Sequence, residues 1–194
     1  MIIALIKLAA AILYIASLSL LWKGVFKRRP VNRKRLALIS LIASGLHLAG
    51  ALLLVFSDQL INFSLFTSGS LIFAVTSLII TLSSIRKPVH ALLLVVQPIC
   101  ILLIATSLSF EPTKITSISS GTAIHILFSI LAYGVITIAA ASAVILMYAS
   151  YKLKHKQVGS MGSLMPPLET TEKLLFEMIL AGEALLTALS LIHI

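Results

Sequence analysis

The chain has a single cysteine, Cys100, which lies in a run of apolar residues. One thiol excludes an internal disulfide and a Cys-x-x-Cys motif, so packing is its expected role. Acidic residues are also scarce: the 194 residues include six Asp and Glu, compared with fifteen Lys and Arg. There is no Gly-x-Ser-x-Gly, no His-Glu-x-x-His and no glycine-rich phosphate loop. The sequence therefore predicts no enzymatic activity.

Apolar residues dominate the chain: they make up 59% of it and give a mean hydropathy of +1.12. A soluble domain is typically about 45–50% apolar, so this excess indicates a membrane protein. The formal charge of +9 does not indicate nucleic-acid binding, because the basic residues form short runs between apolar segments without interleaved aromatic residues. The lipid bilayer is the expected partner, with the basic loops contacting anionic lipids.

Six segments each have about the 20 mostly apolar residues that a membrane-spanning helix needs. Backbone groups in lipid must be hydrogen-bonded within the segment, and the runs are continuous, so helices are expected there and strands are not. The predicted fold class is an all-α, polytopic transmembrane helix bundle that forms a single integral membrane domain over residues 1–194. The segments are approximately Ile2–Trp22, Leu36–Phe56, Phe66–Ser84, Ala91–Ser109, Thr122–Tyr151 and Leu174–Ile194.

Basic residues alternate sharply between the loops. Thirteen of the fifteen Lys and Arg lie between segments one and two, three and four, and five and six, whereas the other two loops hold only Lys114. The remaining lysine, Lys7, is near the start of the first segment and could extend to the membrane surface. The positive-inside rule then predicts that both termini are extracytoplasmic and that the three basic loops are cytoplasmic.

His47 is an ionisable residue at membrane depth. It lies 12 residues after Arg35, which is roughly 18 Å into a hydrocarbon core about 30 Å thick. Such a residue is costly there and marks a functional site by default. Two interpretations stay open: the ring is either neutral and hydrogen-bonded to a neighbouring helix, or it is a ligand of haem or of a metal ion.

His125 lies at the outer end of the fifth segment, with Ser129 four residues later and Tyr133 eight residues later. Residues at this spacing share one face of a helix. Two interpretations stay open. The three side chains either form a polar seam that faces the bundle interior, with His125 as a ligand, or His125 simply lies at the membrane surface, where an ionisable side chain costs little free energy. His47 and His125 differ in expected depth by roughly 10 Å, which favours separate sites over two ligands of one iron.

The other ionisable residues support weaker predictions. Glu183 is near the middle of the sixth segment, where a protonated or paired carboxyl with a structural role is expected ahead of a proton relay. His90 and His155 fall in basic loops, where solvated side chains are expected. A transport function would depend on Glu183 and the histidines alone, since the chain shows no inverted repeat and no pair of broken helices.

Three stretches of the sequence resemble a known family. The residues from His125 to Tyr133 follow the pattern His-[Ile/Val]-x-x-Ser-x-x-x-Tyr, which is similar to the helix that carries an external haem-ligand histidine in cytochrome c assembly proteins of the CcsA type. Leu164–Met178, which contains Pro-Pro-Leu-Glu, and Asn62–Leu71 resemble the YpjD/HemX-like branch of that family. His47 matches an intramembrane histidine of the same branch. The resemblance covers most of the chain and is strongest over residues 62–191.

The resemblance implies a multi-pass protein of the bacterial cytoplasmic (inner) membrane that handles haem. His125 and His47 would be candidate haem ligands, and Ser129 and Tyr133 would support His125 from the same face. Other membrane proteins of cytochrome c or haem biogenesis would be its partners. The alternative is a non-enzymatic partner or regulator, as in HemX-like members, that does not itself ligate haem to cytochrome.

The chain also departs from the best-known members of that family. It has one tryptophan, Trp22, whereas those members carry a tryptophan-rich external segment that cradles the haem. The last apolar segment is still apolar at Ile194, so we expect a C-terminal truncation.

Overall fold

The computed structural model describes residues 2–27, 29–57, 60–62, 64–109, 114–115, 120–156 and 164–192. Within these ranges, six helices are long and apolar enough to cross a membrane, the fourth of them together with a short 3-10 helix, η1 (His90–Leu92), that precedes it. The prediction of an all-helical bundle with about six membrane-spanning helices is confirmed. The helices are α1 (Ile2–Val25), α2 (Arg33–Val55), α3 (Leu65–Arg86), α4 (Leu93–Ser109), α5 (Ser120–Lys154) and α6 (Leu168–Ile192).

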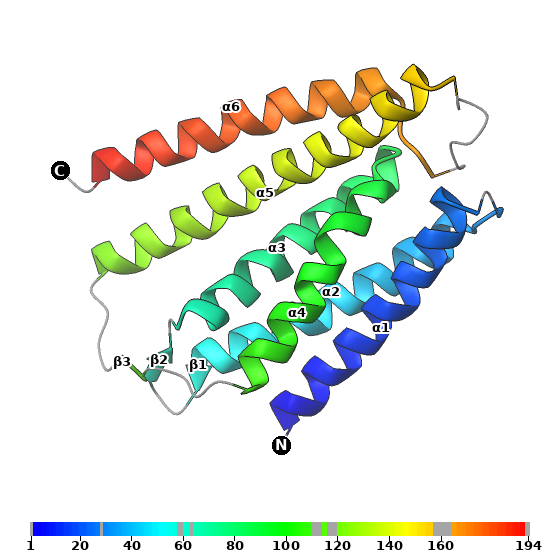
Figure 1. Ribbon diagram of the computed structural model, residues 1–194. Coiled ribbons are helices and arrows are strands. Elements are labelled where there is room, and N and C mark those ends of the chain that lie inside the picture. Colours follow the sequence, from blue (N-terminus) through cyan, green and yellow to red (C-terminus); the bar gives the residue numbers. More distant parts are fainter. Residues whose placement is uncertain are drawn as a thin grey trace.

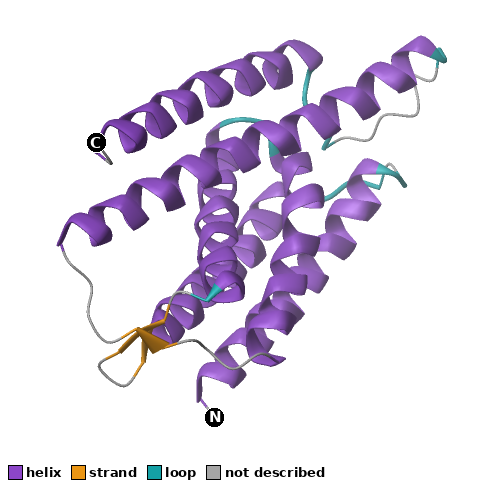
Figure 2. Ribbon diagram, turned by 60° about the vertical axis from the view of Figure 1, so that its left-hand side comes forward, coloured by secondary structure: helices purple, strands orange, loops and turns teal. Residues whose placement is uncertain are grey.

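Three strands of two or three residues form a small antiparallel sheet in the order β1-β2-β3. They are β1 (Phe56–Ser57), β2 (Leu60–Asn62) and β3 (Lys114–Ile115). Figure 2 shows the sheet at one end of the bundle, where it links the connection after α2 to the connection before α5. The strands lie outside the apolar helices, so they do not change the fold class.

Successive helices run in opposite directions, and the start of α1 and the end of α6 lie at the same end of the bundle as the strands (Figure 1). The α1–α2, α3–α4 and α5–α6 connections lie at the opposite end. These are the three connections with the basic residues, and we call this end of the molecule the basic end. The alternation agrees with the predicted topology, and the assignment of the basic end to the cytoplasm stays a prediction.

Helices α1 to α4 form one packed group, and the α5–α6 hairpin joins this group mainly where α5 lies against α3 (Figure 1). The main core lies between these helices and includes Tyr14, Leu36, Val96 and Cys100, all with no exposed surface. Cys100 is a buried free thiol, as its position in an apolar run predicts. The α1–α4 group therefore holds most of the buried side chains, while α6 depends on α5 for its place.

The predicted helix boundaries differ from the observed ones most clearly in the last two helices. α5 runs for 35 residues and extends past the apolar segment at both ends. α6 begins at Leu168 and not at Leu174, because the Pro167 carbonyl accepts hydrogen bonds from the backbone amide and the hydroxyl of Thr171 and so starts the helix. Hydropathy does not detect this start, because five of the six residues from Leu168 to Lys173 are polar.

Candidate functional site

His47 lies inside the α1–α4 group with no exposed surface. Its Nδ1 is 3.3 Å from the Tyr14 hydroxyl on α1, and its Nε2 is 2.9 Å from the Ser70 Oγ on α3. In a neutral imidazole one nitrogen donates and the other accepts, and a hydroxyl can take either complementary part. The Tyr14 and His47 rings also meet edge to face, with centroids 5.7 Å apart. His47 therefore joins α2 to two neighbouring helices.

This arrangement matches the first of the two interpretations of His47, a histidine hydrogen-bonded to neighbouring helices. Both ring nitrogens are engaged, so ligation of iron would require the release of Tyr14 or of Ser70. In the described ranges, no group of three or more His, Cys, Asp or Glu side chains is placed to hold a metal ion. A ligand role for His47 stays a prediction.

A second buried polar cluster lies closer to the basic end, where it joins α1, α2 and α4. The Oγ atoms of Ser17 and Ser40 are 2.8 Å apart, and Gln97 Nε2 donates to Ser40 Oγ at 3.2 Å. All three side chains are fully buried. Among the residues that the structure describes, Gln97 Oε1 and Ser77 Oγ have no hydrogen-bond partner. The mainly apolar interior of the α1–α4 group thus contains buried polar side chains at several levels along its length.

Lys7 does not extend to the membrane surface, because its side chain is fully buried within the bundle. Its Nζ donates to Ser107 Oγ at 2.8 Å, close to the end of α4. Its aliphatic stem lies against Gly50, where an added Cβ would be 2.9 Å from Lys7 Cγ. The missing side chain at Gly50 therefore makes the space in which this lysine is buried.

We expect Lys7→Met to leave the free energy of unfolding unchanged or to raise it by about 1–2 kcal/mol. Methionine keeps the buried stem and removes an ammonium group, and apolar replacement of buried charges is often neutral or stabilising. Unfolding in mixed micelles, followed by circular dichroism, measures the change. Ser107→Ala leaves the ammonium without its hydroxyl and should cost about 1–3 kcal/mol. A loss above about 1 kcal/mol in Lys7→Met would contradict this account of the lysine.

His125 lies in the early turns of α5, at the end of the bundle that holds the strands, and its side chain is partly exposed. The Ser129 hydroxyl donates to the backbone carbonyl of His125 at 2.8 Å. Tyr133 is 52% exposed. The face that these three residues share is therefore partly buried at His125 and Ser129 and exposed at Tyr133.

The structure does not bring His47 and His125 together. His47 is bonded to α1 and α3 inside the α1–α4 group. His125 is on α5, which packs against α3 from the other side, so that α3 lies between α2 and α5 (Figure 1). The two histidines therefore lie on helices that flank α3, and their assignment to separate haem sites stays a prediction.

Glu177 and Glu183, two of the four glutamates of α6, are exposed. Glu177 lies 3.9 Å from Lys173 one turn earlier, which is a surface ion pair of little energetic weight. Glu183, at the middle of α6, has an exposed side chain. The buried polar groups of the α1–α4 group therefore do not involve Glu183.

His155 is exposed, as predicted, whereas the prediction of a solvated His90 is wrong. His90 begins η1 and is only 3% exposed. The turn after α3 is short, and η1 packs against the helices with Ala91 and Leu92 almost fully buried, so the ring is carried inward with them. Its position in a basic connection gave no sign of this burial.

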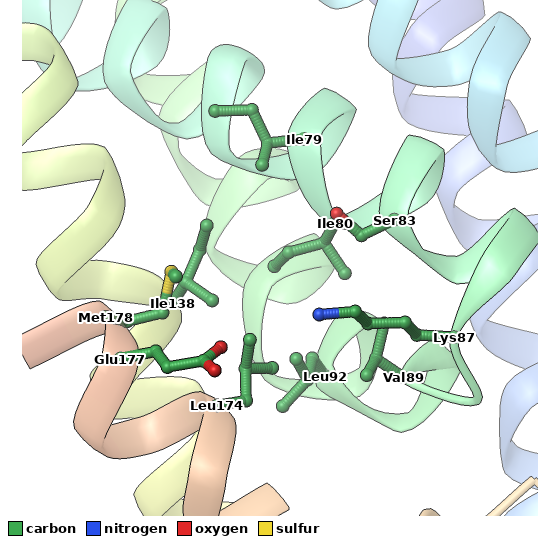
Figure 3. Close-up of a pocket in the computed structure, with 10 residues that line it drawn as sticks. All are labelled: Ile79, Ile80, Ser83, Lys87, Val89, Leu92, Ile138, Leu174, Glu177 and Met178. Carbon is green, nitrogen blue, oxygen red and sulfur yellow. The ribbon is translucent and has the colours of Figure 1, made fainter. Parts of the chain in front are cut away.

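The described cavities gather at the basic end, around Lys87. One of about 140 Å³ lies between the end of α3, η1, α5 and the first half of α6 and is walled mainly by aliphatic side chains (Figure 3). Lys87 and Glu177 point toward it from opposite sides. A larger cavity of about 360 Å³ shares Lys87 with it and is lined by basic residues.

The sequence analysis missed the partners of His47, although part of the signal was present. Ser40, Ser44 and His47 recur at i, i+4 and i+7 on α2, and such residues share one helical face. All three are fully buried. Helical spacing could therefore have identified a polar face on α2, but not Tyr14 and Ser70 as the residues that it meets.

Comparison with known proteins gives both a family and relatives. The sequence model described as "Cytochrome C assembly protein" matches residues 5–192. The chain is 28% identical over 184 residues to "Inner membrane protein YpjD" of Escherichia coli K12, and equally to the proteins of that name in E. coli O6:H1 and O157:H7. The match covers 93% of this chain and 70% of those proteins. No solved structure matches. With its six apolar helices, the chain is a multi-pass inner membrane protein.

Proposed function

Because the chain belongs to the cytochrome c assembly protein family, we propose that it handles haem at the outer face of the inner membrane, with His125 as a residue that would hold the iron. The observation that carries this proposal is the partly exposed His125 side chain on α5, at the end of the bundle opposite the basic connections. The proposed role is non-enzymatic: the chain would bind the haem iron and orient the macrocycle.

The residues around His125 fit one side of a haem. Neutral imidazole is a common iron ligand, and bound haem would supply a redox-active iron centre. Ser129 hydrogen-bonds the backbone carbonyl of His125, so its hydroxyl does not compete for the ring. Tyr133, two turns along the same face, exposes a flat ring against which a macrocycle can pack. These residues would provide one ligand to the iron and a support for the macrocycle.

His47 enters the proposal as a candidate ligand at a different site. Freeing one of its nitrogens leaves a buried hydroxyl unpaired, which costs about 1–3 kcal/mol. Haem binding at His47 would have to offset this cost together with the separation of packed helices. We therefore expect His47 to act in the first place as the group that joins α1, α2 and α3.

Haem binding can be tested on the full chain purified in detergent after expression with ample haem. We expect a Soret band in the wild-type protein and a band more than tenfold weaker in His125→Ala. Mutation of a residue that only hydrogen-bonds a metal ligand already costs about 10–100-fold in metal affinity or activity, and loss of the ligand itself should cost at least as much. His155→Ala is the matched control, because His155 is exposed at the other end of α5. A wild-type protein without a Soret band, or a band unchanged in the His125→Ala His47→Ala double variant, would refute the proposal.

A second candidate function is that of a non-enzymatic partner or regulator of another membrane protein of haem or cytochrome c biogenesis. The observation that favours it is the small buried share of α6. Its membrane-spanning window is 11% buried, against 22–44% in the other five helices. Phe176 and Leu180 on this helix are 62% and 71% exposed. A wild-type protein that binds no haem would make this the preferred function.

A further inference from the structure

The pairing of His47 with Ser70 has a counterpart two turns nearer the basic end of the bundle. Ser40 precedes His47 by seven residues on α2, and Ser77 follows Ser70 by seven residues on α3. Residues seven apart lie on the same face of a helix, and α2 and α3 run in opposite directions, so Ser40 and Ser77 lie at one level of the α2–α3 contact. Ser17 on α1 reaches the same level, since its Oγ is 2.8 Å from Ser40 Oγ.

Gln97 brings α4 to this level as well. Its Nε2 donates to Ser40 Oγ at 3.2 Å, so its amide lies beside Ser40. Cys100, one turn further along α4, donates from its Sγ to the Phe73 carbonyl at 3.5 Å, and Ser77 is one turn after Phe73 on α3. Because α3 and α4 run in opposite directions, Gln97 and Ser77 lie at the same height. Each helix of the α1–α4 group thus contributes one buried polar side chain, and we call these four the polar level: Ser17, Ser40, Ser77 and Gln97.

Two polar atoms of the polar level are buried without a partner. Among the residues that the structure describes, Gln97 Oε1 and Ser77 Oγ make no hydrogen bond, and neither side chain has exposed surface. A hydroxyl in a helix often donates to the carbonyl four residues earlier, as that of Thr81 does. For Ser77 this carbonyl belongs to Phe73, and it already accepts from Cys100. The two atoms are an acceptor and a donor, so one small molecule between them would satisfy both.

An aliphatic layer separates the polar level from the basic end. Each helix of the α1–α4 group places one aliphatic side chain about one turn nearer that end than its polar residue, and all four belong to the main core and are almost fully buried. They are Leu21 on α1, Leu36 on α2, Ile80 on α3 and Leu93 on α4. A molecule bound at the polar level is therefore enclosed on this side, and the level is not part of a pore that opens at the basic end.

We propose that the polar level is a binding site for a buried water molecule between Gln97 Oε1 and Ser77 Oγ. The water donates to the amide oxygen and accepts from the hydroxyl, and the Tyr14 side chain, which lies close to Ser77, offers a third partner. Buried waters typically make about three hydrogen bonds to groups that are otherwise unsatisfied, and one water needs only about 10–15 Å³. The side chains between this level and His47 are small, because Ala43 and Ala74 stand there on α2 and α3.

A water fits the site better than a monovalent cation does. A cation would need acceptor oxygens around it, whereas the Gln97 amide also directs its Nε2–H into the cluster. No Asp or Glu occurs in α1, α2, α3 or α4, and the buried Lys7 ammonium in the same group would repel a cation. The water hydrogen-bonds α3 to the cluster on α1, α2 and α4, and through Tyr14 it joins that cluster to His47. The site does not depend on haem binding.

X-ray radiolysis of the full chain in detergent tests for the water, because hydroxyl radicals formed from a bound water oxidise the side chains next to it. Cys100 and Tyr14 lie close to Ser77 and have no exposed surface, so bulk water does not reach them. We expect mass spectrometry to find both oxidised in the wild type. The oxidation should be lost in Gln97→Leu Ser77→Ala, which removes the two atoms that hold the water.

Thr76→Val is the matched control for the radiolysis experiment. Thr76 is also fully buried on α3, but its hydroxyl donates to the Ile72 carbonyl and lies against Gly134 of α5. This variant should keep the oxidation of the two buried side chains, and Tyr151, which is exposed near the basic end, gives the dose reference. No oxidation of Cys100 and Tyr14 in the wild type, or oxidation that persists in Gln97→Leu Ser77→Ala, would overturn the proposal.

Thermal unfolding gives an independent readout. We expect Gln97→Leu and Ser77→Ala each to lower the Tm, and the double variant to lower it by less than the sum of the two, because each single change already releases the shared water. Additive shifts would contradict a water held by both residues. If sodium chloride raises the wild-type Tm above its value in choline chloride of the same ionic strength, and Gln97→Leu abolishes that rise, the site binds a monovalent cation and the water assignment is overturned.

Discussion

His47→Ala is expected to lower the free energy of unfolding of the bundle by about 2–4 kcal/mol. Truncation of a large buried side chain typically costs about 2–5 kcal/mol, because a cavity remains. The variant also loses the interactions with Tyr14 and Ser70, and interhelical hydrogen bonds in membranes contribute about 0.6 kcal/mol on average and at most about 1.7. Unfolding of the haem-free protein in mixed micelles, followed by circular dichroism, measures the loss.

His155→Ala provides the control for His47→Ala, since an exposed substitution should change stability by no more than about 0.5 kcal/mol. A double-mutant cycle with Tyr14→Phe isolates the pair, and we expect a coupling energy of about 0.6–1.7 kcal/mol. If the haem-free His47→Ala protein is as stable as the wild type and its haem spectrum is changed, the main role of His47 is to bind haem and not to join the helices.

The helices were predictable because a bilayer leaves the backbone few choices. Each segment had to satisfy its own hydrogen bonds over about 20 residues, so hydropathy alone located all six. The depth of His47 was estimated in the same way, from the number of residues after the last cation of the basic run, and it stays a prediction. These predictions depend on one segment at a time, and for that reason they did not need the tertiary structure.

The contacts between helices were not predictable on this basis. Lys7 was expected at the surface because its position in the segment is close to one end, but its burial depends on Gly50 and Ser107 in two other helices. His90 was expected in water because its neighbours are basic, but η1 turns it inward. In both cases the deciding residue lies far away in the sequence or in a turn, where hydropathy carries no information.

Gly182→Leu is expected to destabilise the protein by about 1–3 kcal/mol, because it separates α6 from the rest of the bundle. Gly182 is buried against α5, and a Cβ there would be 2.7 Å from Ile136 Cγ1 and 3.8 Å from the Ile136 backbone nitrogen. Isoleucine has one strongly preferred χ1 rotamer in a helix, so Ile136 cannot turn aside at little cost. Since α6 packs on α5 and on little else, the two helices would have to move apart.

Gly45→Leu is the matched control for Gly182→Leu, because an added Cβ at Gly45 meets nothing within 4 Å and the site is exposed. We expect it to be neutral or stabilising by up to about 1 kcal/mol, since leucine favours the helix over glycine. Adding Ile136→Ala to Gly182→Leu should recover part of the lost stability, as it opens space at the contact. If Gly182→Leu and Gly45→Leu behave alike, the close approach of α5 and α6 does not determine the position of the last helix.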